Sequence, residues 1–460
     1  MKHKYALKLI AVPLLAVIFL MVPILVACQP PALTAAPTQV PTAVTTAVPT
    51  GAATAAATPK PSTATPAPSA TPKPAARPAT ISVGVVSDMT GPTASGAVWE
   101  ISGFQDIAKW ANETNYVPGV IFDTIAYDNR FDMGRSLNAY ELMKTRGVSV
   151  VHMQMTGANY ALNPKYKADK IVALIPPAPK ALSPVGWAFS SDGAYADGAA
   201  AGFEWVIKDW KASGQPGKPK LAWLTWDADY GLAGPIVNWY ATSIGIDVLR
   251  NEFYAAQAPS DVTAQLLRIR DAGANYVFSL GVQAAWITVV NDAQRLGLKD
   301  KIKFVGIGNA VESDVFINLT KAAGEGTYQV QFFSSMNEGN LPGVQWLRDT
   351  QTKYRSEWVN NITGTRGYMA MRLVVEAIKA AIQKDGIAPD KVDGQAIYNS
   401  MEKNIKNFDT GGLSGPLTIS ADNHSAANMV KMFQYQKQVQ TPITDWFPAP
   451  HMTRFEDVQK

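Results

Sequence analysis

The sequence is poor in the residues that metal, redox and nucleophilic chemistry require. Its 460 residues include one cysteine, Cys28, and four histidines, which do not stand at the spacing of a metal site. No serine lies in a Gly-x-Ser-x-Gly motif. Gly306–Ile307–Gly308 is followed by Val311, where a dinucleotide fingerprint requires glycine. We therefore expect no catalytic residues, no metal and no cofactor.

Acidic residues are missing from the start of the chain. Residues 1–80 contain six of the 41 Lys and Arg residues and none of the 37 Asp and Glu residues, which leaves 35 basic and 37 acidic residues beyond them. The net charge of +4 therefore belongs to the start of the chain, and the rest is nearly neutral. A nucleic-acid-binding domain usually carries a basic patch, so we expect no nucleic-acid partner.

The first residues have the pattern of an export signal. Three lysines precede an apolar run over residues 9–27, which ends in Leu25–Val26–Ala27–Cys28. Leu-Val-Ala-Cys resembles a bacterial lipobox, so we expect residues 1–28 to be a lipoprotein signal peptide with Cys28 as the lipidated residue. An uncleaved transmembrane anchor is the alternative, because the apolar run is almost long enough to span a bilayer.

Residues 29–80 consist almost entirely of Pro, Ala and Thr. Such a segment buries too little apolar surface to offset the entropy lost on ordering. We expect a disordered tether that would reach roughly 160 Å if it were fully extended. The chain as a whole is 47% hydrophobic and 17% charged. The residues beyond 80 are numerous enough to form a large core.

The folded part opens with a strand, a loop and a helix. Residues 81–86 are mostly β-branched, residues 87–96 are rich in Ser, Thr, Gly and Pro, and residues 97–114 have apolar positions at helical spacing. In open α/β sheets the loops at the carboxyl ends of the strands form the ligand crevice. Residues 87–96 are therefore the first place where a ligand site is expected.

Short buried strands then alternate with helical patterns, which is typical of βαβ units around parallel sheets. Strands are predicted at residues 120–126, 148–153, 171–175, 220–226, 246–253, 275–281 and 303–308, with further β-like runs at 417–420 and 429–434. Helices are predicted at 135–146, 194–210, 261–272, 284–296, 366–384 and 394–403. The pattern restarts near residue 187, so we expect two lobes with a ligand site between them.

Six short motifs occur in an order that resembles one protein family. They are Met89–Thr90–Gly91–Pro92, Tyr127–Asp128–Asn129, Asp229–Tyr230–Gly231, residues 293–298, residues 323–326 and Leu413–Ser414–Gly415–Pro416. From about residue 81 to 435 the chain resembles the branched-chain amino-acid-type solute-binding proteins of ABC transporters, in the periplasmic binding protein type I family. The resemblance implies two doubly wound parallel-sheet lobes, joined by three crossings near Ser190, Gln329–Phe333 and Gly415, that close on a small ligand.

The resemblance also implies the boundaries of the lobes. We expect residues 81–190 with 330–414 to form the N-terminal lobe, and residues 191–329 with 415–460 to form the C-terminal lobe.

The ligand residues are transferred from the family motif by motif. In amino-acid binders of the family, hydroxyl and N–H groups on the loop after the third strand, here Thr156–Gly157–Ala158, hold the ligand carboxylate. A backbone carbonyl on the loop after the fourth strand, here Ala178–Pro179–Lys180, adds a contact. Trp226 and Trp99 are candidates for aromatic walls, with a place in the core as the alternative. The predicted ligand-binding residues are Thr156, Gly157, Ala178, Tyr230, Gln283, Asn309, Trp226 and Trp99.

One position argues against an ordinary amino acid as the ligand. Where the family places an acid for the ligand ammonium, this sequence has Gly308–Asn309–Ala310. A buried ammonium without a carboxylate would cost several kcal/mol, so we expect leucine, isoleucine and valine to bind weakly. Lys180 is a candidate contact for an anionic ligand, with a solvated surface position as the alternative.

The sequence thus predicts the extracytoplasmic solute-binding component of an ABC importer, lipid-anchored to the membrane. Its partners would be a small organic solute (amino-acid-like, an amide or a carboxylate) and the transmembrane subunits of the permease, and we expect a monomer. A ligand-sensing ectodomain of the same fold is the alternative. An exported hydrolase is disfavoured because no nucleophile motif is present.

Overall fold

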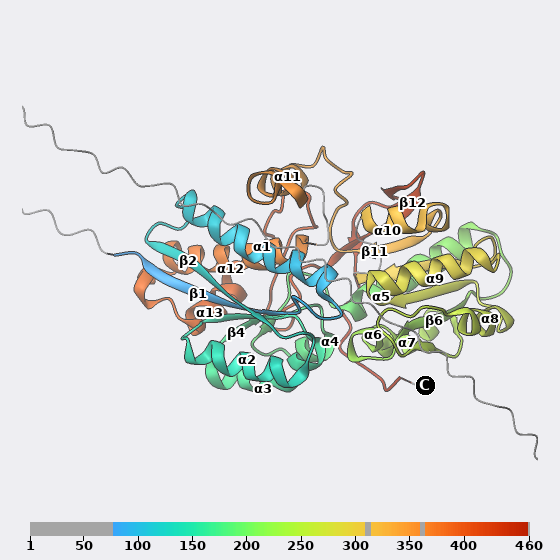
Figure 1. Cartoon of the computed structure of the whole chain (residues 1–460), viewed down its shortest axis with the longest axis horizontal. Coiled ribbons are helices and arrows are strands. Elements are labelled where there is room, and N and C mark those ends of the chain that lie inside the picture. The colour runs from blue at the N-terminus through green and yellow to red at the C-terminus, as the bar shows by residue number, and fades with distance from the viewer. Residues whose placement is uncertain (1–76, 309–313, 359–363, 459–460) are drawn as a thin grey trace, which may run out of the picture. The chain divides into compact units, whose positions relative to one another are not determined.

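The computed structural model describes residues 77–308, 314–358 and 364–458. The predicted signal peptide with Cys28, nearly all of the tether, and Asn309 lie outside these residues. Two sheets with flanking helices make up the described part (Figure 1). Within it, no helix combines the length and the apolar character needed to cross a membrane.

The first sheet consists of five parallel strands in the order β2-β1-β3-β4-β5. These strands are β1 (Ala79–Ser87), β2 (Val120–Asp128), β3 (Val150–Met153), β4 (Val172–Leu174) and β5 (Ala188–Phe189). Val85 of β1 pairs with Ala126 on one side and His152 on the other. This is a doubly wound order whose switch point lies between β1 and β3, so the loops after these two strands flank the crevice.

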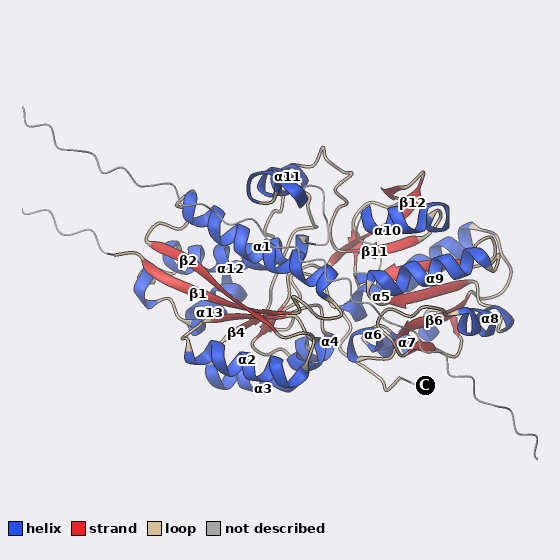
Figure 2. Cartoon of the chain, in the orientation of Figure 1, coloured by secondary structure: helices blue, strands red, loops and turns tan. Residues whose placement is uncertain are grey.

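Two groups of helices cover the first sheet (Figure 2). One group comprises α1 (Ala94–Glu113), α12 (Thr365–Gln383) and α13 (Gly394–Asn404). The other comprises α2 (Met133–Thr145), α3 (Thr156–Asp169) and the short α4 (Pro179–Leu182). We call the first sheet with these helices, and with α11 (Pro342–Tyr354), which packs on α1, the first lobe.

Helices α1 and α12 approach so closely that only glycine fits at their crossing. A Cβ on Gly103 would lie 2.3 Å from the backbone nitrogen of Tyr368, and one on Gly367 would lie 1.9 Å from the carbonyl oxygen of Glu100. The remaining contact surface is apolar, with Phe104 and Ile107 of α1 fully buried. This close contact fixes α12 against α1, which itself packs on β1 and β2.

The second sheet repeats the doubly wound order and extends it. Its main path is β13-β12-β11-β10-β9-β6-β7, with β8 paired to β6 and β14 paired to β12. The parallel strands are β6 (Lys220–Trp226), β7 (Asp247–Val248), β8 (Glu252–Tyr254), β9 (Tyr276–Leu280), β10 (Lys303–Ile307) and β11 (Tyr328–Gln331). The antiparallel additions are β12 (Met429–Gln436), β13 (Val439–Pro442) and β14 (Phe447–Pro448). The switch point here lies between β6 and β9.

Helices again cover the second sheet, and together they form the second lobe. The helices are α5 (Tyr195–Ala212), α6 (Asp229–Leu232), α7 (Asn238–Ser243), α8 (Thr263–Asp271), α9 (Gln283–Arg295) and α10 (Asp314–Thr320). Single 3-10 turns occur in both lobes: η1 (Pro235–Val237) and η3 (Lys321–Gly324) in the second, and η4 (Ser356–Trp358) beside α11 and η5 (Pro389–Lys391) beside β1 in the first. Phe203 of α5 is fully buried against Trp223 of β6 and Phe278 of β9.

Three stretches of chain pass between the lobes side by side. Ser190, after β5, pairs with Ser425, and Phe333, after β11, pairs with Ser414. Backbone hydrogen bonds from Ser190 N to the His424 carbonyl (3.0 Å) and from Ala426 N to the Ser190 carbonyl (2.9 Å) reinforce the first pair.

Three local predictions were wrong. Residues 156–158 are not a loop but the first residues of α3, whose sequence pattern is interrupted by Pro164. The strand predicted at 246–253 is two short strands, β7 and β8. Residues 417–420 form only single bridges, Phe408 with Leu417 and Ser420 with Asn423, rather than a strand.

Candidate functional site at the carboxyl ends of the two sheets

The loops at the carboxyl ends of the two sheets contact one another. Gly157 at the start of α3 lies against Asp229 of α6, because a Cβ on Gly157 would be 2.6 Å from Oδ2 of Asp229. Tyr195 N at the start of α5 donates a 3.0 Å hydrogen bond to the carbonyl of Pro177, which follows β4. The two switch points therefore face each other, which is where a doubly wound fold binds its ligand.

Carboxylates hold the first-lobe loops in place. Asp88, which is fully buried, accepts hydrogen bonds from Gly91 N (2.5 Å), Thr93 N (2.6 Å) and Thr93 Oγ1 (2.7 Å). Asp128 at the end of β2 accepts from Met89 N (2.8 Å), Thr90 Oγ1 (2.6 Å) and Arg130 N (3.1 Å).

The pKa of Asp128 reflects these bonds. Desolvation alone would raise this pKa, but the donors from Thr90, Met89 and Arg130 outweigh it and lower the pKa of Asp128 to about 2. The carboxylate is therefore charged at any physiological pH, and the loop it organises is firmly set.

Among the predicted ligand residues of the first lobe, Thr156 is the first residue of α3 and is 4% exposed. Its neighbour Gly157 lies so close to Asp229 that a side chain at this position would require the Asp229 carboxylate to move. Ala178 is fully buried at the start of α4. Trp99 lies within α1, half-buried, and its carbonyl lies close to Gly364 at the start of α12.

The predicted residues of the second lobe gather near the end of β6. Tyr230, 9% exposed, donates a 3.3 Å hydrogen bond to the Gly281 carbonyl and meets the ring of Tyr195 edge-on at 5.1 Å. Trp226 is the last residue of β6, and its Nε1 donates to the Ala255 carbonyl at 3.1 Å. Gln283 is half-buried as the first residue of α9, directly after the Gly281 loop.

A buried charged cluster lies where the lobes join. Arg366, the second residue of α12, forms an ion pair with Asp192, which follows the first crossing. His152 of β3 faces Glu100 of α1, with Nε2 and Oε2 3.7 Å apart, and its Nδ1 lies 3.0 Å from the Leu174 carbonyl. The cluster connects the first sheet to the start of the second lobe.

Burial and charge act in opposite directions on the two acids of this cluster. Desolvation raises the pKa of Asp192 despite the neighbouring Arg366. Desolvation also acts upward on Glu100, but the neighbouring His152 and Arg366 side chains outweigh it, so the pKa of Glu100 lies below its usual value. Glu100 is therefore an anion in the folded protein.

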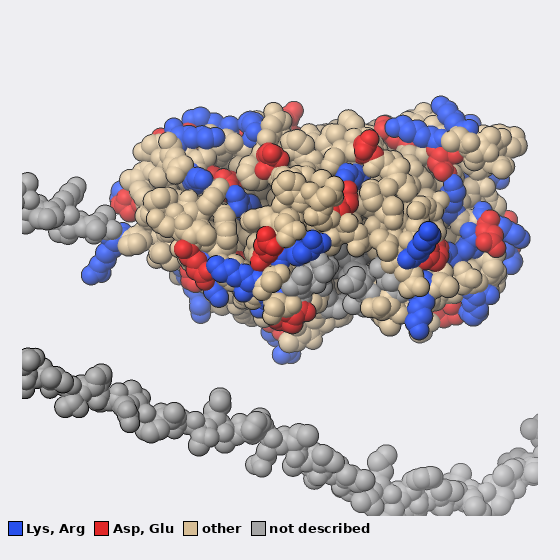
Figure 3. All heavy atoms as spheres, turned by 90° about the horizontal axis from the view of Figure 1, so that it is seen from above, with Lys and Arg blue, Asp and Glu red and all other residues tan. Residues whose placement is uncertain are grey.

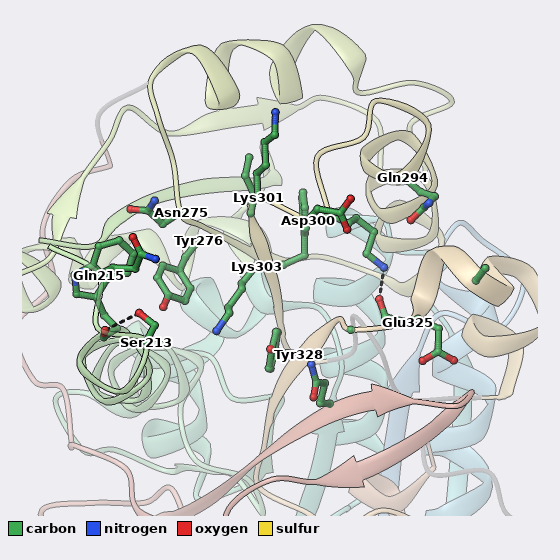
Figure 4. A pocket seen from close by; sticks show the side chains of 17 residues that line it. Ser213, Gln215, Asn275, Tyr276, Gln294, Asp300, Lys301, Lys303, Glu325 and Tyr328 are labelled. Carbon is green, nitrogen blue, oxygen red and sulfur yellow. Dashed lines mark hydrogen bonds between the residues drawn. The ribbon is translucent and has the colours of Figure 1, made fainter. Parts of the chain in front are cut away.

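A separate pocket of about 780 Å³ lies at the opposite edge of the second sheet (Figure 4). Its floor includes Tyr276, Lys303 and Tyr328, the first residues of β9, β10 and β11. Lys303 Nζ is paired with both oxygens of Asp209 at 2.7 and 2.6 Å, and Lys299 Nζ donates to two carbonyls of residues 323 and 325. These cations are already satisfied by the protein, and the pocket is remote from both switch points.

The surface carries both signs of charge. Figure 3 shows Lys and Arg side chains interspersed with Asp and Glu over the face in view, without a continuous basic field among the described residues there. No group of three or more His, Cys, Asp or Glu side chains in the described ranges is placed to hold a metal ion.

The family model for periplasmic binding proteins matches residues 80–440. The chain belongs to the periplasmic binding protein family. Membership of this family implies a location outside the cytoplasm. Comparison with curated protein sequences finds no significant match.

Solved structures of other binding proteins share the fold of this family member. A branched-chain amino acid ABC transporter protein from Thermus thermophilus with bound valine is 21% identical, with a TM-score of 0.71 over 81% of this chain and 97% of that one. An ABC transporter substrate-binding protein from Aeropyrum pernix is 20% identical, with a TM-score of 0.71 over 82% and 97%. A solute-binding protein from Rhodopseudomonas palustris BisB5 with 3,4-dihydroxybenzoic acid is 20% identical, with a TM-score of 0.66 over 80% and 98%.

The match and these structures confirm the predicted family and the predicted fold of two doubly wound parallel-sheet lobes. Several residues at the facing loops of this binding protein were missed from the sequence. Phe131, Tyr195 and Arg366 all contribute contacts between elements that are distant in the chain. Only the charged cluster has a sequence signal, which is an ionisable side chain among apolar residues. Glu100 stands on the buried side of α1, and His152 lies inside a buried strand.

Proposed function

We propose that this protein is the solute-binding component of an ABC importer and that the solute binds between the facing carboxyl ends of the two sheets. The observation that carries the proposal is the contact between the two switch points, at Gly157 and Asp229. Two lobes that meet at their ligand-binding edges and are joined by three adjacent strands of chain can close around a small molecule. Membership of the periplasmic binding protein family supports the same function.

The proposed solute is a small organic molecule that is amino-acid-like, an amide or a carboxylate. Structural neighbours hold valine and 3,4-dihydroxybenzoic acid, so the fold accepts both aliphatic and aromatic solutes. The rings of Tyr195, Tyr230 and Trp226 offer aromatic surface at the facing loops. Leucine, isoleucine and valine are proposed to bind weakly, since Gly308–Asn309–Ala310 contains no acid where the family places one for the ligand ammonium.

The remaining parts of the proposal concern the organisation of the chain. Residues 1–28 are a lipoprotein signal peptide, residues 29–80 tether the folded part, and Cys28 carries the lipid that anchors a monomer to the membrane beside its permease. Residues 81–190 with 330–414, and 191–329 with 415–460, are the two lobes. The protein performs no catalysis itself.

The function is tested by native mass spectrometry of the full-length purified protein, which identifies a co-purified solute, followed by calorimetric titration. Thr156 and Tyr230 are both buried, so isosteric changes that remove only their hydroxyls, Thr156→Val and Tyr230→Phe, are used together. Two lost hydrogen bonds at about 0.5–1.5 kcal/mol each predict binding that is weaker by about tenfold.

The matched control is Thr145→Val with Tyr354→Phe, which removes the same hydroxyls far from the facing loops. We expect the control to bind like the wild type. A double variant at Thr156 and Tyr230 that binds as tightly as wild type would place the solute elsewhere. Absence of any solute binding, including to valine and 3,4-dihydroxybenzoate, would contradict the proposed function.

A further inference from the structure

Phe131 brings the first lobe into contact with the second lobe's Trp226. Phe131 follows β2, and its half-buried ring stacks on the indole of Trp226 with ring centroids 5.7 Å apart and planes inclined by 27°. Three residues beyond Trp226, Asp229 lies against Gly157 of the first lobe. The end of β6 therefore contacts the first lobe at two neighbouring points.

The backbone that presents Phe131 is strained. Arg130 and Phe131 have φ values of +50° and +54°, a left-handed conformation that side chains other than glycine rarely adopt. Asn129 Oδ1 accepts a hydrogen bond from Phe131 N at 3.0 Å, and Asp128 Oδ1 accepts one from Arg130 N at 3.1 Å. A strained backbone of this kind persists only where many surrounding contacts hold it in place, and it is typical of ligand clamps and switches.

Trp226 is fixed independently within its own lobe. Its Nε1 donates to the Ala255 carbonyl at 3.1 Å, and the residue is only 9% exposed. The indole is therefore a firm surface in the second lobe, and the strained turn of the first lobe carries the ring that docks on it. Opening of the lobes would separate the two rings and expose both to water.

We propose that Phe131 and Trp226 are positioning residues that form a latch between the lobes beside the solute site. The proposal rests on the solute-binding function, because a latch regulates how long a solute stays enclosed. The rings touch only when the lobes are closed, so their contact stabilises the closed form over the open one by its own interaction energy. The strained turn holds the phenyl ring in the docking position before closure.

The latch is tested by measuring the distance between the lobes in the full-length protein without any solute. Spin labels are attached through Ala168→Cys on α3 and Ala264→Cys on α8, both exposed, with Cys28 replaced by serine, and distances are recorded by pulsed electron paramagnetic resonance. An aromatic pair contributes enough to change the ratio of open to closed molecules by up to about tenfold. We expect Phe131→Ala to raise the ratio of open to closed molecules by up to this factor.

Three further variants separate the latch from a general loss of structure. Phe131→Trp restores a stacking ring and should restore the wild-type distances. Arg130→Gly keeps the ring but loosens the turn that positions it, so the closed population should fall by less than in Phe131→Ala. Phe447→Ala removes a half-buried phenylalanine within the second lobe and should leave the distances unchanged. If Phe131→Ala lowers the melting temperature, Phe131→Leu, which keeps apolar volume without a planar face, replaces it.

Unchanged distances in Phe131→Ala, or an equal shift in Phe447→Ala, would overturn the latch. Because no solute is present, the result does not depend on whether the protein binds one. If Phe131→Ala changes the distances as expected but no solute is found, only the proposed function is contradicted. If a solute binds between the lobes but Phe131→Ala leaves the distance between the lobes unchanged, only the latch is contradicted.

Discussion

The facing loops of the two lobes are held in place by different chemistry. In the first lobe, Asp88 and Asp128 accept hydrogen bonds from backbone N–H groups of the loops that they organise. In the second lobe, the rings of Trp226, Tyr230 and Tyr254 pack beside the loops that follow the strands. The side-chain hydrogen bonds here are few, from Trp226 to the Ala255 carbonyl and from Tyr230 to the Gly281 carbonyl. The first arrangement is directional and depends on charge, whereas the second depends on shape and burial.

This difference determines which changes each lobe tolerates. A carboxylate that accepts several N–H bonds cannot be removed without leaving buried donors unsatisfied, which costs about 1–3 kcal/mol for each donor. An aromatic ring tolerates the loss of a hydroxyl as long as its volume remains. The four predictions below test this comparison, from the largest expected effect to the smallest.

Removal of the Asp88 carboxylate should have the largest effect. Asp88→Ala leaves the backbone N–H groups of Gly91 and Thr93 without acceptors, and we expect a loss of about 2–3 kcal/mol in the free energy of unfolding. Asp88→Asn keeps one acceptor oxygen and should cost about half as much. Denaturant unfolding followed by circular dichroism measures both, and equal stability of the alanine and asparagine variants would contradict this account.

Asp128 should make the first lobe sensitive to acid. Its pKa is about 2 when folded and 3.8 when unfolded, so its contribution is present above pH 4 and is lost as pH falls through 2. The shift corresponds to about 1–2 kcal/mol after allowance for solvent screening. Asp128→Asn should remove this acid dependence, and a wild-type slope in the variant between pH 4 and 2 would show that other groups cause it.

An ion pair attaches the C-terminal segment to the second lobe. Asp197 of α5 accepts hydrogen bonds from His451 Nδ1 (3.2 Å) and Met452 N (2.8 Å). The hydrogen bond to Asp197 raises the pKa of His451 above its usual value, although burial opposes this. The resulting stability is complete below about pH 6.5 and is lost as pH rises through the higher folded pKa.

We expect the C-terminal segment to exchange its amide hydrogens faster at pH 8 than at pH 6, after correction for intrinsic rates, by a factor equivalent to about 1 kcal/mol. His451→Gln should abolish the difference between the two pH values. A variant that keeps the full pH dependence would assign the effect to another group.

The smallest effect is expected for a hydroxyl of the second lobe. Tyr254 Oη is buried without a geometrically satisfactory hydrogen-bond partner, so Tyr254→Phe removes an unsatisfied polar atom and keeps the ring. We expect the free energy of unfolding to change by no more than about 0.5 kcal/mol, in the stabilising direction. A loss of more than 1 kcal/mol in a thermal melt would show that the second lobe also relies on polar contacts.

The same difference explains what the sequence could predict. Most of the parallel strands, about half of the helices and the family follow from local patterns, and the loop around Asp88 is readable because Asp, Thr, Gly and Pro define a turn within a few residues. The contacts of Phe131 with Trp226, and of Arg366 with Asp192, join residues that are 95 and 174 positions apart. No local pattern indicates such pairs, so the latch and the charged cluster emerged only from the structure.

The glycine-lined crossing of α1 and α12 has a consequence for biogenesis. Asp106 of α1 accepts a 2.7 Å hydrogen bond from Tyr368 Oη, and the two residues lie 262 positions apart. A contact of such long range forms only after most of the polypeptide has left the ribosome, and high contact order slows folding. Until α12 has been synthesised, the apolar face of α1 that it covers stays exposed and the first lobe cannot complete its folding. The chain therefore remains unfolded for longer.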